Sequence, residues 1–395
     1  MRSLVLLLMT VLACSWRAHA DTPGQSVDGA YLVQTQTLTR HSDRAAQSDE
    51  YITAAAQEVF WRGKGELSSE GIENSERMGQ AYRDIYVQSD FIDGRCLPKE
   101  VRFRSSDVNR VLMTSASFSR GLFREGNRTI VAPLTTVPYK EDNVLAVNYD
   151  CLLGWDDMIS KYGLDPSQSM PNQILSKMRQ LEWQCAQPTA DKSDTIISEY
   201  ANSKTSTQLN PTEKGCATGD AKIFMYNYLE SLGGSGTNNS QARTRLQRTV
   251  GQLPSTIIAN MRAMIECYAF QPEEYCGPFD GKAIYYFSHD VNELALINIF
   301  TFQSGARSYF QGKAPNFGSS LTFELWVKDD KYYCKVFIKN GVEENFDEFD
   351  ICSFIPNNAE YTRVGRYCTV DALERAAQNY LDENEPECMP PAQVG

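Results

Sequence analysis

Histidine is scarce in this sequence, whose 395 residues contain three. His19 falls in an N-terminal stretch that we interpret below as a leader, which leaves His41 and His289 to a mature protein. Zinc sites usually draw their ligands from several His and Cys side chains, and two separate histidines, one of them flanked by arginines, fit that pattern poorly. The sequence therefore predicts no bound metal.

Several common catalytic signatures are missing as well. The sequence contains no Gly-x-Ser-x-Gly elbow, no Walker loop and no Cys-x-x-Cys pair. These absences disfavour an α/β-hydrolase, a P-loop nucleotide-binding enzyme and a thioredoxin-like redox protein, and no cofactor is predicted. The net charge of −12 disfavours nucleic acid and anionic membranes as partners.

A long apolar run occurs only at the N-terminus. Arg2 precedes an almost wholly apolar stretch at 4–13, and Ala18-His19-Ala20 has the small-x-small pattern of a cleavage site. We therefore interpret residues 1–20 as a signal peptide. No later segment is long and apolar enough to span a membrane. We expect a protein that is secreted or lies in the lumen of the secretory or lysosomal pathway.

Cysteine, in contrast, is abundant, with eleven residues in the chain. Loss of Cys14 with the signal peptide leaves an even number, which suits disulfide bonds in an oxidising compartment. The sequons that begin at Asn127 and Asn238 predict glycosylation.

Strand and helix patterns alternate at both ends of the chain. Runs rich in β-branched and aromatic residues predict strands at 30–41, 101–104 and 282–290 and a hairpin at 321–341. Apolar residues at helical spacing predict helices at 69–86, 108–122, 292–300 and 371–382. Between them, strands are hard to find and helical pieces prevail. The pattern predicts an α/β protein with a central mixed, mostly parallel sheet flanked by helices in residues 21–145 and 276–395, and a smaller, mostly helical cap domain inserted at 146–275.

Charged groups cluster where the predicted strands end. They are Arg40, His41 and Arg44 after the first strand, Arg110 in the first turn of the helix after the second, and His289 and Asp290 after the third. Ligand crevices in open α/β sheets form outside the carboxyl ends of the strands. Each motif alone is more simply an ion-paired loop or a helix-surface group. Together, with no other histidine available, they favour one shared anion site.

That inventory of three guanidinium groups, two imidazoles and a carboxylic acid suits hydrolysis of a phosphate monoester. A guanidinium fork binds two phosphate oxygens and keeps its charge at any pH. An imidazole nucleophile divides the reaction into two steps through a phosphohistidine. A carboxylic acid beside it can protonate the leaving alkoxide.

Four segments also resemble motifs of the histidine acid phosphatases. "TRHSDRAA" (39–46) is similar to the RHGxRxP motif and "GELSSEG" (65–71) to Gly-x-Leu-Thr-x-x-Gly. "RSSDVNRVLMTSAS" (104–117) is similar to RSTDxxRTxxSA, and "FSHDVN" (287–292) to the HD motif. The resemblance covers about residues 30–385 and is weakest from 145 to 275.

The resemblance implies a role for each candidate residue, on a phosphoglycerate-mutase-like fold. His41 would be the nucleophile and Asp290 the proton donor, and the phosphate would be bound by Arg40, Arg44, Arg110 and His289. It also implies an acidic optimum, broad specificity for small phosphomonoesters and no metal. Members are often dimeric, so a homodimer is compatible with the resemblance.

The same resemblance implies two disulfides, Cys151–Cys388 and Cys352–Cys368. The pairing of the other six cysteines is left open by the sequence: Cys96, Cys185, Cys216, Cys267, Cys276 and Cys334.

Three positions depart from the family motifs. Ser42 replaces the glycine of RHG, Ala46 the proline, and Val291 the threonine that usually follows HD. A glycine at the first position would matter if it served a left-handed backbone angle or a close approach to phosphate. The leading interpretation is an acid phosphatase that acts through a phosphohistidine on His41. The alternative is a secreted ligand-binding protein on the same fold with little or no turnover. A mutase with the same nucleophile is disfavoured by the signal peptide and the cysteines.

Overall fold

A computed structural model describes most of the chain after the N-terminal stretch. The described residues are 23–25, 29–48, 52–125, 128–147, 154–178, 190–233, 240–270, 281–301, 305–355, 363–364 and 367–378. The predicted signal peptide, the sequons at Asn127 and Asn238, and the pair Cys151 and Cys388 lie outside them.

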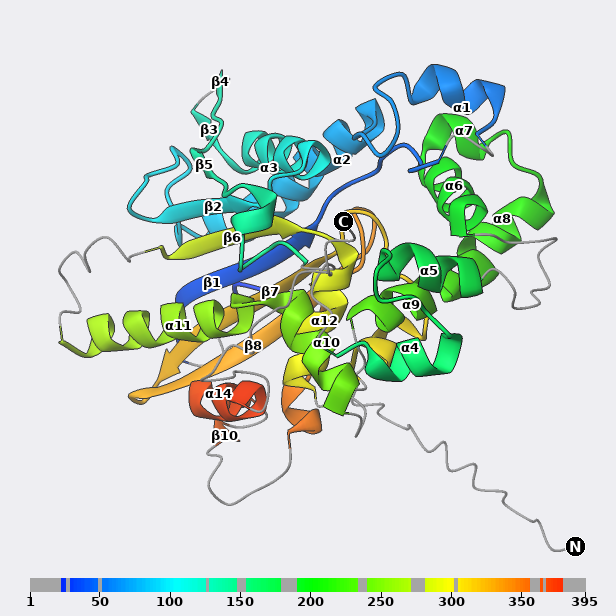
Figure 1. Cartoon of the computed structure of the whole chain (residues 1–395). Coiled ribbons are helices and arrows are strands. Elements are labelled where there is room, and N and C mark those ends of the chain that lie inside the picture. Colours follow the sequence, from blue (N-terminus) through cyan, green and yellow to red (C-terminus); the bar gives the residue numbers. More distant parts are fainter. Residues whose placement is uncertain are drawn as a thin grey trace, which may run out of the picture.

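A mixed sheet flanked by helices runs through the molecule (Figure 1), which confirms the predicted α/β class. Its strands lie in the order β10 (Arg363–Val364), β11 (Tyr367–Thr369), β8 (Lys331–Lys339), β7 (Ser320–Lys328), β1 (Tyr31–Arg40), β6 (Ala283–Ser288), β2 (Val101–Ser105) and β5 (Leu134–Thr135), and β9 (Phe346–Glu348) pairs with β8. Among the described pairings, the parallel ones join β1, β6, β2 and β5, and the others are antiparallel. The parallel half is the one whose strand ends carry the predicted site.

Helices cover both faces of this sheet. On one face pack α2 (Ser69–Tyr82), its continuation η1 (Arg83–Val87) and α3 (Asn109–Leu122), and on the other pack α10 (Ser240–Val250), α11 (Leu253–Phe270), α12 (Asp290–Phe300) and α14 (Val370–Gln378). Alternate residues of β6 serve the two cores: Tyr285 and Phe287 join α2 and α3, whereas Ile284 and Tyr286 join the opposite helices. Figure 1 shows α2 and α3 on one side of β1 and α11 on the other. The period of two along β6 therefore matches a strand buried on both faces.

The two buried amide side chains inside β1, those of Gln34 and Gln36, form hydrogen bonds with α11, with β6 and with the residues just before β6. Gln36 donates to the carbonyl of Ile257 at 2.8 Å, and its own carbonyl oxygen accepts from Asn260 at 3.1 Å and from the Tyr286 hydroxyl at 3.2 Å. Gln34 donates to the carbonyl of Gly281 at 3.0 Å. A central strand can bury these amides because hydrogen bonds offset the loss of hydration.

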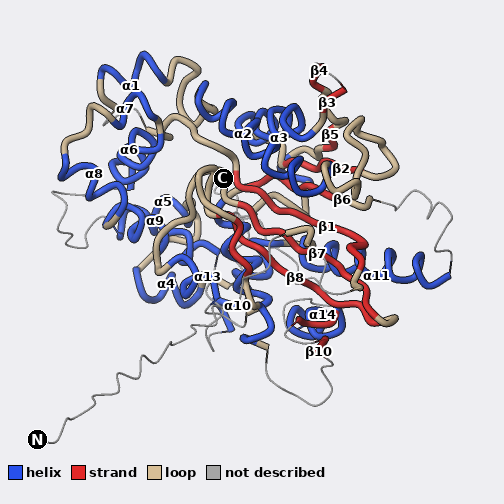
Figure 2. Tube along the Cα trace, turned by 180° about the vertical axis from the view of Figure 1, so that it is seen from behind, coloured by secondary structure: helices blue, strands red, loops and turns tan. Residues whose placement is uncertain are grey.

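A group of shorter helices stands at the carboxyl ends of the parallel strands, within the segment expected to be the cap. They are α4 (Asp156–Tyr162), α5 (Met170–Met178), α6 (Ala190–Ala201), α7 (Ser203–Ser206), α8 (Pro211–Thr218) and α9 (Asp220–Gly233). Seen from behind, the sheet extends from these helices toward the far end of β7 and β8 (Figure 2). The predicted cap boundary at residue 275 stays a prediction. The contacts favour an earlier boundary, because α10 and α11 share the core of the sheet.

The remaining described elements are α1 (Ala54–Val59), η2 (Tyr139–Glu141), α13 (Gly305–Phe310), η4 (Ile351–Phe354) and the short pair β3 (Arg124–Glu125) and β4 (Arg128–Thr129). No helix in the described ranges combines the length and hydropathy needed to cross a membrane.

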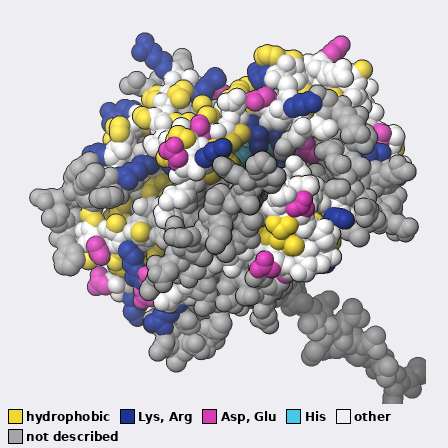
Figure 3. Space-filling model, in the orientation of Figure 1, with side chains coloured by type: hydrophobic (Ala, Val, Ile, Leu, Met, Phe, Trp, Pro, Cys, Tyr) yellow, Lys and Arg dark blue, Asp and Glu magenta, His cyan; other side chains and the backbone are white. Residues whose placement is uncertain are grey.

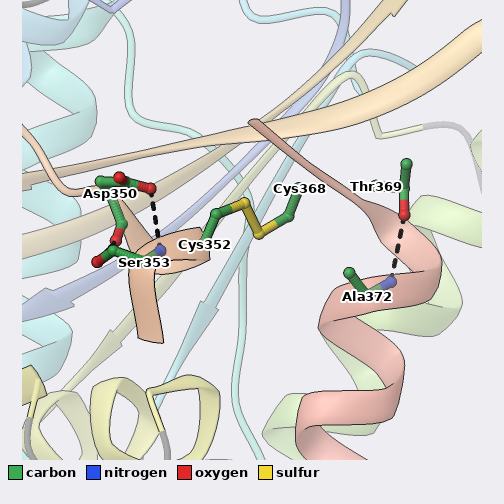
Figure 4. Close-up of a disulfide and its surroundings, with 6 residues drawn as sticks. All are labelled: Asp350, Cys352, Ser353, Cys368, Thr369 and Ala372. Atoms are coloured by element: carbon green, nitrogen blue, oxygen red, sulfur yellow. Dashed lines mark hydrogen bonds between the residues drawn. A yellow bond between two sulfur atoms is a disulfide. The ribbon is translucent and has the colours of Figure 1, made fainter. Parts of the chain in front are cut away.

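The cysteines are less completely paired than their even number suggested. Cys352 and Cys368 form a disulfide that ties η4 to β11 (Figure 4). Cys216 and Cys267 each take part in a disulfide as well. Cys96 and Cys334, in contrast, are free and buried. Cys96 packs with α2 and α3 while Cys334 packs in the core on the opposite face of the sheet, so the sheet separates the two thiols.

Helices α2 and α3 lie unusually close together because Gly79 faces the backbone of α3. A Cβ atom on Gly79 would lie 2.0 Å from the carbonyl oxygen of Phe118. We predict that Gly79→Ala lowers the free energy of unfolding by about 1–3 kcal/mol, because the helices must separate to admit one methyl group. Urea denaturation with disulfides intact measures this change.

The matched control is Gly215→Ala in α8, where an added Cβ meets nothing within 4 Å. Alanine there should be neutral or stabilising by up to about 1 kcal/mol, because it restricts the unfolded chain. Equal effects of the two substitutions would show that α2 and α3 do not depend on the close approach.

Candidate active site

The carboxyl ends of three neighbouring strands bring the predicted residues together. Arg40 is paired with Ser288 across β1 and β6, and beyond the strands the His41 N–H donates to the Ser288 carbonyl at 3.0 Å. The Ser106 N–H donates to the Phe287 carbonyl at 3.0 Å, which continues the ladder to β2. The structure thus places all six predicted residues in one region: Arg40, His41, Arg44, Arg110, His289 and Asp290.

A cavity of about 350 Å³ opens over these residues. His41, Arg44, Arg110, His289 and Asp290 line one part of it, and the rest of the described wall is mostly apolar. Figure 3 shows histidine and Lys or Arg side chains inside a hollow of the surface.

His41 is held as a neutral imidazole with one nitrogen available. It is 2 % exposed, and its Nδ1 lies 3.0 Å from the carbonyl oxygen of Ser42, which can only accept. We therefore assign the proton to Nδ1, which leaves the lone pair on Nε2. Burial, followed by the positive charges of Arg110 and Arg40, holds the pKa of His41 well below its usual 6.5.

His289 is the second imidazole of the cluster. Its ring centre is 5.6 Å from that of His41, and its Nε2 lies 3.3 Å from the Ser106 hydroxyl. Burial and the charge of Arg110 lower its pKa to about 3. The N-cap of α3 is Val108, without a side-chain bond, and the Ser106 hydroxyl, just before it, contacts His289.

The serine that replaces the motif glycine is accommodated without strain. Ser42 is absent from the residues with positive φ. Its N–H donates to Thr114 Oγ1 at 3.1 Å, and its hydroxyl donates to the Asp43 carboxylate at 3.0 Å. The departure from the family motif therefore carries no backbone penalty.

The glycine-containing segment at 65–71 braces this loop. The Gly65 N–H donates to the carbonyl of Ala46 and the Ser68 N–H to that of Asp43, both at 2.9 Å. A Cβ on Gly71 would lie 2.1 Å from the Asp43 carbonyl oxygen, so only glycine lets α2 begin so close to the loop.

Two of the three arginines are paired with carboxylates. Arg40 lies 2.7 Å from Asp290, and its guanidinium stacks over Phe317 with 4.3 Å to the ring centre. Arg44 binds both oxygens of Asp194 on α6, at 2.7 and 3.1 Å. The backbone N–H of Gln47 donates to the same carboxylate at 2.8 Å. Asp194 thereby joins the cap helices to the site.

Arg110 lacks such a partner among the described residues. It forms no ion pair with a described carboxylate, and burial lowers its pKa to about 10. The Nε atoms of Arg40, Arg44 and Arg110 are all buried without a hydrogen-bond partner. Arg44 and Arg110 line the cavity, and Arg40 lies behind it against Asp290. Because buried donors are ordinarily satisfied, these unpaired nitrogens indicate a site that an anion completes.

Sequence reasoning missed two carboxylates of this region. Glu293 is fully buried one helical turn after His289, accepts from the Ser319 hydroxyl at 2.5 Å and leaves Oε1 without a partner. Burial raises its pKa to about 8, so the neutral acid does not repel an anion at lower pH. The i, i+4 spacing from His289 could have revealed Glu293, whereas no local pattern marks Asp194.

Comparisons with known proteins agree with this geometry. Residues 31–339 match the family model of the histidine phosphatase superfamily (branch 2). The chain belongs to this family. Histidine phosphatases similar to it include the testicular acid phosphatase of Homo sapiens, 25% identical over 81% of this chain and 71% of that protein. The lysosomal acid phosphatase of Rattus norvegicus is 25% identical over 74% of this chain and 67% of that protein.

Solved structures show the same fold. The phytase of Hafnia alvei in complex with tartrate matches with a TM-score of 0.57 and 15% identity, over 91% of this chain and 99% of that one. The phytase of Citrobacter braakii matches with a TM-score of 0.55 and 13% identity, over 89% of this chain and 98% of that one. This histidine phosphatase is thus an enzyme of the phosphatase class, built on the fold shared with these phytases. In the described ranges, no group of three or more His, Cys, Asp or Glu side chains is placed to hold a metal ion.

The Arg44–Asp194 pair generates a prediction about anion binding. Asp194→Asn leaves a buried guanidinium without its counter-charge, and we expect a loss of about 3 kcal/mol in the free energy of unfolding. Millimolar phosphate should restore more stability in this variant than in the wild type, because the anion replaces the missing charge beside Arg44. Thermal unfolding with and without phosphate measures both effects.

Asp157→Asn is the control, since Asp157 on α4 pairs with Arg245 on α10 and does not line the cavity. Phosphate should not relieve its loss of stability. Equal relief of the two variants would mean that the anion does not bind beside Arg44.

Proposed function

We propose that this histidine phosphatase is an acid phosphatase that hydrolyses phosphate monoesters through a phosphohistidine on His41. One observation carries the proposal: a buried neutral imidazole, with its Nδ1 committed to the Ser42 carbonyl, lines the same cavity as Arg44 and Arg110. The free Nε2 is a nucleophile, and the guanidinium groups stabilise the charge on the equatorial oxygens as the phosphoryl group transfers.

In the first step His41 Nε2 attacks phosphorus and the bond to the ester oxygen breaks. The carboxyl proton of Asp290 goes to the leaving alkoxide, so the alcohol departs neutral. In the second step water attacks the phosphohistidine, the Asp290 carboxylate takes a proton from that water, and His41 returns to its neutral form. Inorganic phosphate then leaves.

Before substrate binds, Arg40 and Asp290 form an ion pair with each other. An incoming phosphate dianion competes with Asp290 for the Arg40 guanidinium. Once displaced from that contact, the Asp290 carboxyl group is free to face the ester oxygen of the leaving group.

The names of the relatives support an acid phosphatase in this sense, and the likeness to the phytases supports the fold. We further propose that the chain enters the secretory pathway, as its N-terminal sequence predicts, to be secreted or retained in a lumen. Glycosylation at Asn127 and Asn238, the Cys151–Cys388 bridge and a homodimer stay predictions. The alternative of a ligand-binding protein without turnover rested mainly on Ser42. The backbone there does not have a positive φ, which answers the part of that argument that concerned the backbone angle.

The nucleophile is tested by His41→Ala, which should abolish release of nitrophenol from its phosphate ester. A rapid alkaline quench of the wild-type reaction should trap the phosphoryl group on His41. Because the pKa of His41 is well below 6.5, wild-type turnover should persist in acid where an exposed imidazole would be protonated and unable to attack.

Thermal unfolding of His41→Ala shows whether the variant is folded. Substantial residual activity in a folded variant would remove His41 from the role of nucleophile. A folded wild type that binds phosphate without any turnover would instead favour the ligand-binding alternative.

The proton donor is tested by Asp290→Asn. Esters of aliphatic alcohols, whose alkoxides need a proton, should lose far more kcat than nitrophenyl phosphate, because nitrophenolate leaves without one. Comparing kcat for the two ester types in wild type and variant measures the difference. Equal losses on both would assign Asp290 to phosphate binding alone.

A further inference from the structure

The cavity wall has two chemically different parts. The anion-binding part has been described above, and it contains every cationic side chain that lines the cavity among the described residues. The remaining described wall is mostly apolar. Its aliphatic members are Val108, Val147, Pro171, Met225, Leu229, Leu232 and Val291, and its members with a polar group are Gln47, Tyr139 and Tyr228.

Helix α9 contributes more residues to this apolar wall than any other described element. Met225, Leu229 and Leu232 are spaced four and three residues apart, which places them in a single stripe along the helix. Leu229 and Leu232 are 6 % and 4 % exposed, so their accessible surface is small. Both residues line the cavity, so the small surface that they expose faces the space open to a ligand.

The apolar wall begins next to the proposed proton donor. Val291 follows Asp290 directly, and both line the cavity. A Cβ on Gly233 at the end of α9 would lie 3.2 Å from Val291 Cγ2, so α9 meets the catalytic helix α12 at this point. The ester oxygen that takes the proton must lie near Asp290. The carbon skeleton attached to it therefore runs along Val291 toward the stripe of α9.

We infer that this cavity selects phosphate monoesters whose leaving group is a short alkyl chain or a single apolar ring, with one phosphate. The inference deepens the proposed function and rests on it for the direction of the leaving group. A cavity of about 350 Å³ is near the lower end for ligand sites, which run from about 300 to 1,000 Å³. A second phosphate or a polyol would press charged or hydroxyl groups against aliphatic side chains with no described cation to receive them.

The test is a series of ethyl, butyl and hexyl phosphates, whose leaving alcohols are chemically alike and differ in apolar length. Each methylene buried against the wall should raise kcat/KM by about two- to fourfold until the cavity is full. Glycerol 2-phosphate and myo-inositol hexakisphosphate should be hydrolysed less well than butyl phosphate. Binding of the matching alkylphosphonates, measured by calorimetry, gives the same chain-length dependence without turnover.

Leu229→Asn should flatten the increase with chain length, because it places an amide in the apolar stripe. Leu229→Met, which keeps the wall apolar, should preserve the increase and shows that the readout survives substitution at this position. The matched control is Ile223→Asn, a polar change on α9 outside the cavity wall, which should also preserve it.

The outcomes separate the two proposals. Equal kcat/KM for all chain lengths, or a preference for myo-inositol hexakisphosphate, would overturn the inference while the proposed phosphatase chemistry stands. Phosphonate affinity that rises with chain length, without turnover of any ester, would support the apolar subsite and overturn the proposed function.

Discussion

Buried positive charge at the carboxyl ends of β1, β6 and β2 is the constraint on which the rest of the site depends. Removing guanidinium groups from water costs several kcal/mol per ion unless counter-charges and hydrogen bonds compensate. Asp290 compensates Arg40 and Asp194 compensates Arg44, while the imidazoles of His41 and His289 and the buried Glu293 are held neutral. The site keeps a net positive charge and hydrogen-bond donors without partners, and a phosphate group matches both in sign and in geometry.

The groups of the site come from two parts of the chain, the sheet with its flanking helices and the inserted helices. The sheet and its flanking helices supply the residues proposed as nucleophile, proton donor and anion-binding groups. The inserted helices supply Asp194, which pairs with Arg44, and the stripe on α9 that lines the cavity. In the proposed function, the chemistry thus belongs to the part with the recognisable motifs and the contact with the leaving group to the inserted helices, a division compatible with one fold serving many substrates.

The sequence predicts correctly the features that depend on neighbouring residues, and it fails where a feature depends on residues far apart in the chain. Strands β1 and β6 and helices α2 and α3 are set by local periodicity, and the six charged residues could be foreseen because strand ends of a parallel sheet meet at one edge. Asp194 could not be foreseen, because its partner Arg44 is 150 residues away. The free thiols of Cys96 and Cys334 were missed because an even number of cysteines says nothing about which face of a sheet each one occupies.

The amides buried in β1 have a consequence for the nucleophile at its end. A shift of β1 by one residue against its neighbours would turn every side chain to the opposite face and move His41 by about 3.3 Å along the strand. Purely aliphatic side chains would tolerate such a slip better than Gln36, whose bonds to Ile257, Asn260 and Tyr286 can form in one alignment only. Hydrogen bonds five residues upstream therefore act as a register lock. They fix where the His41 imidazole lies relative to Arg44 and Arg110 at the edge of the sheet.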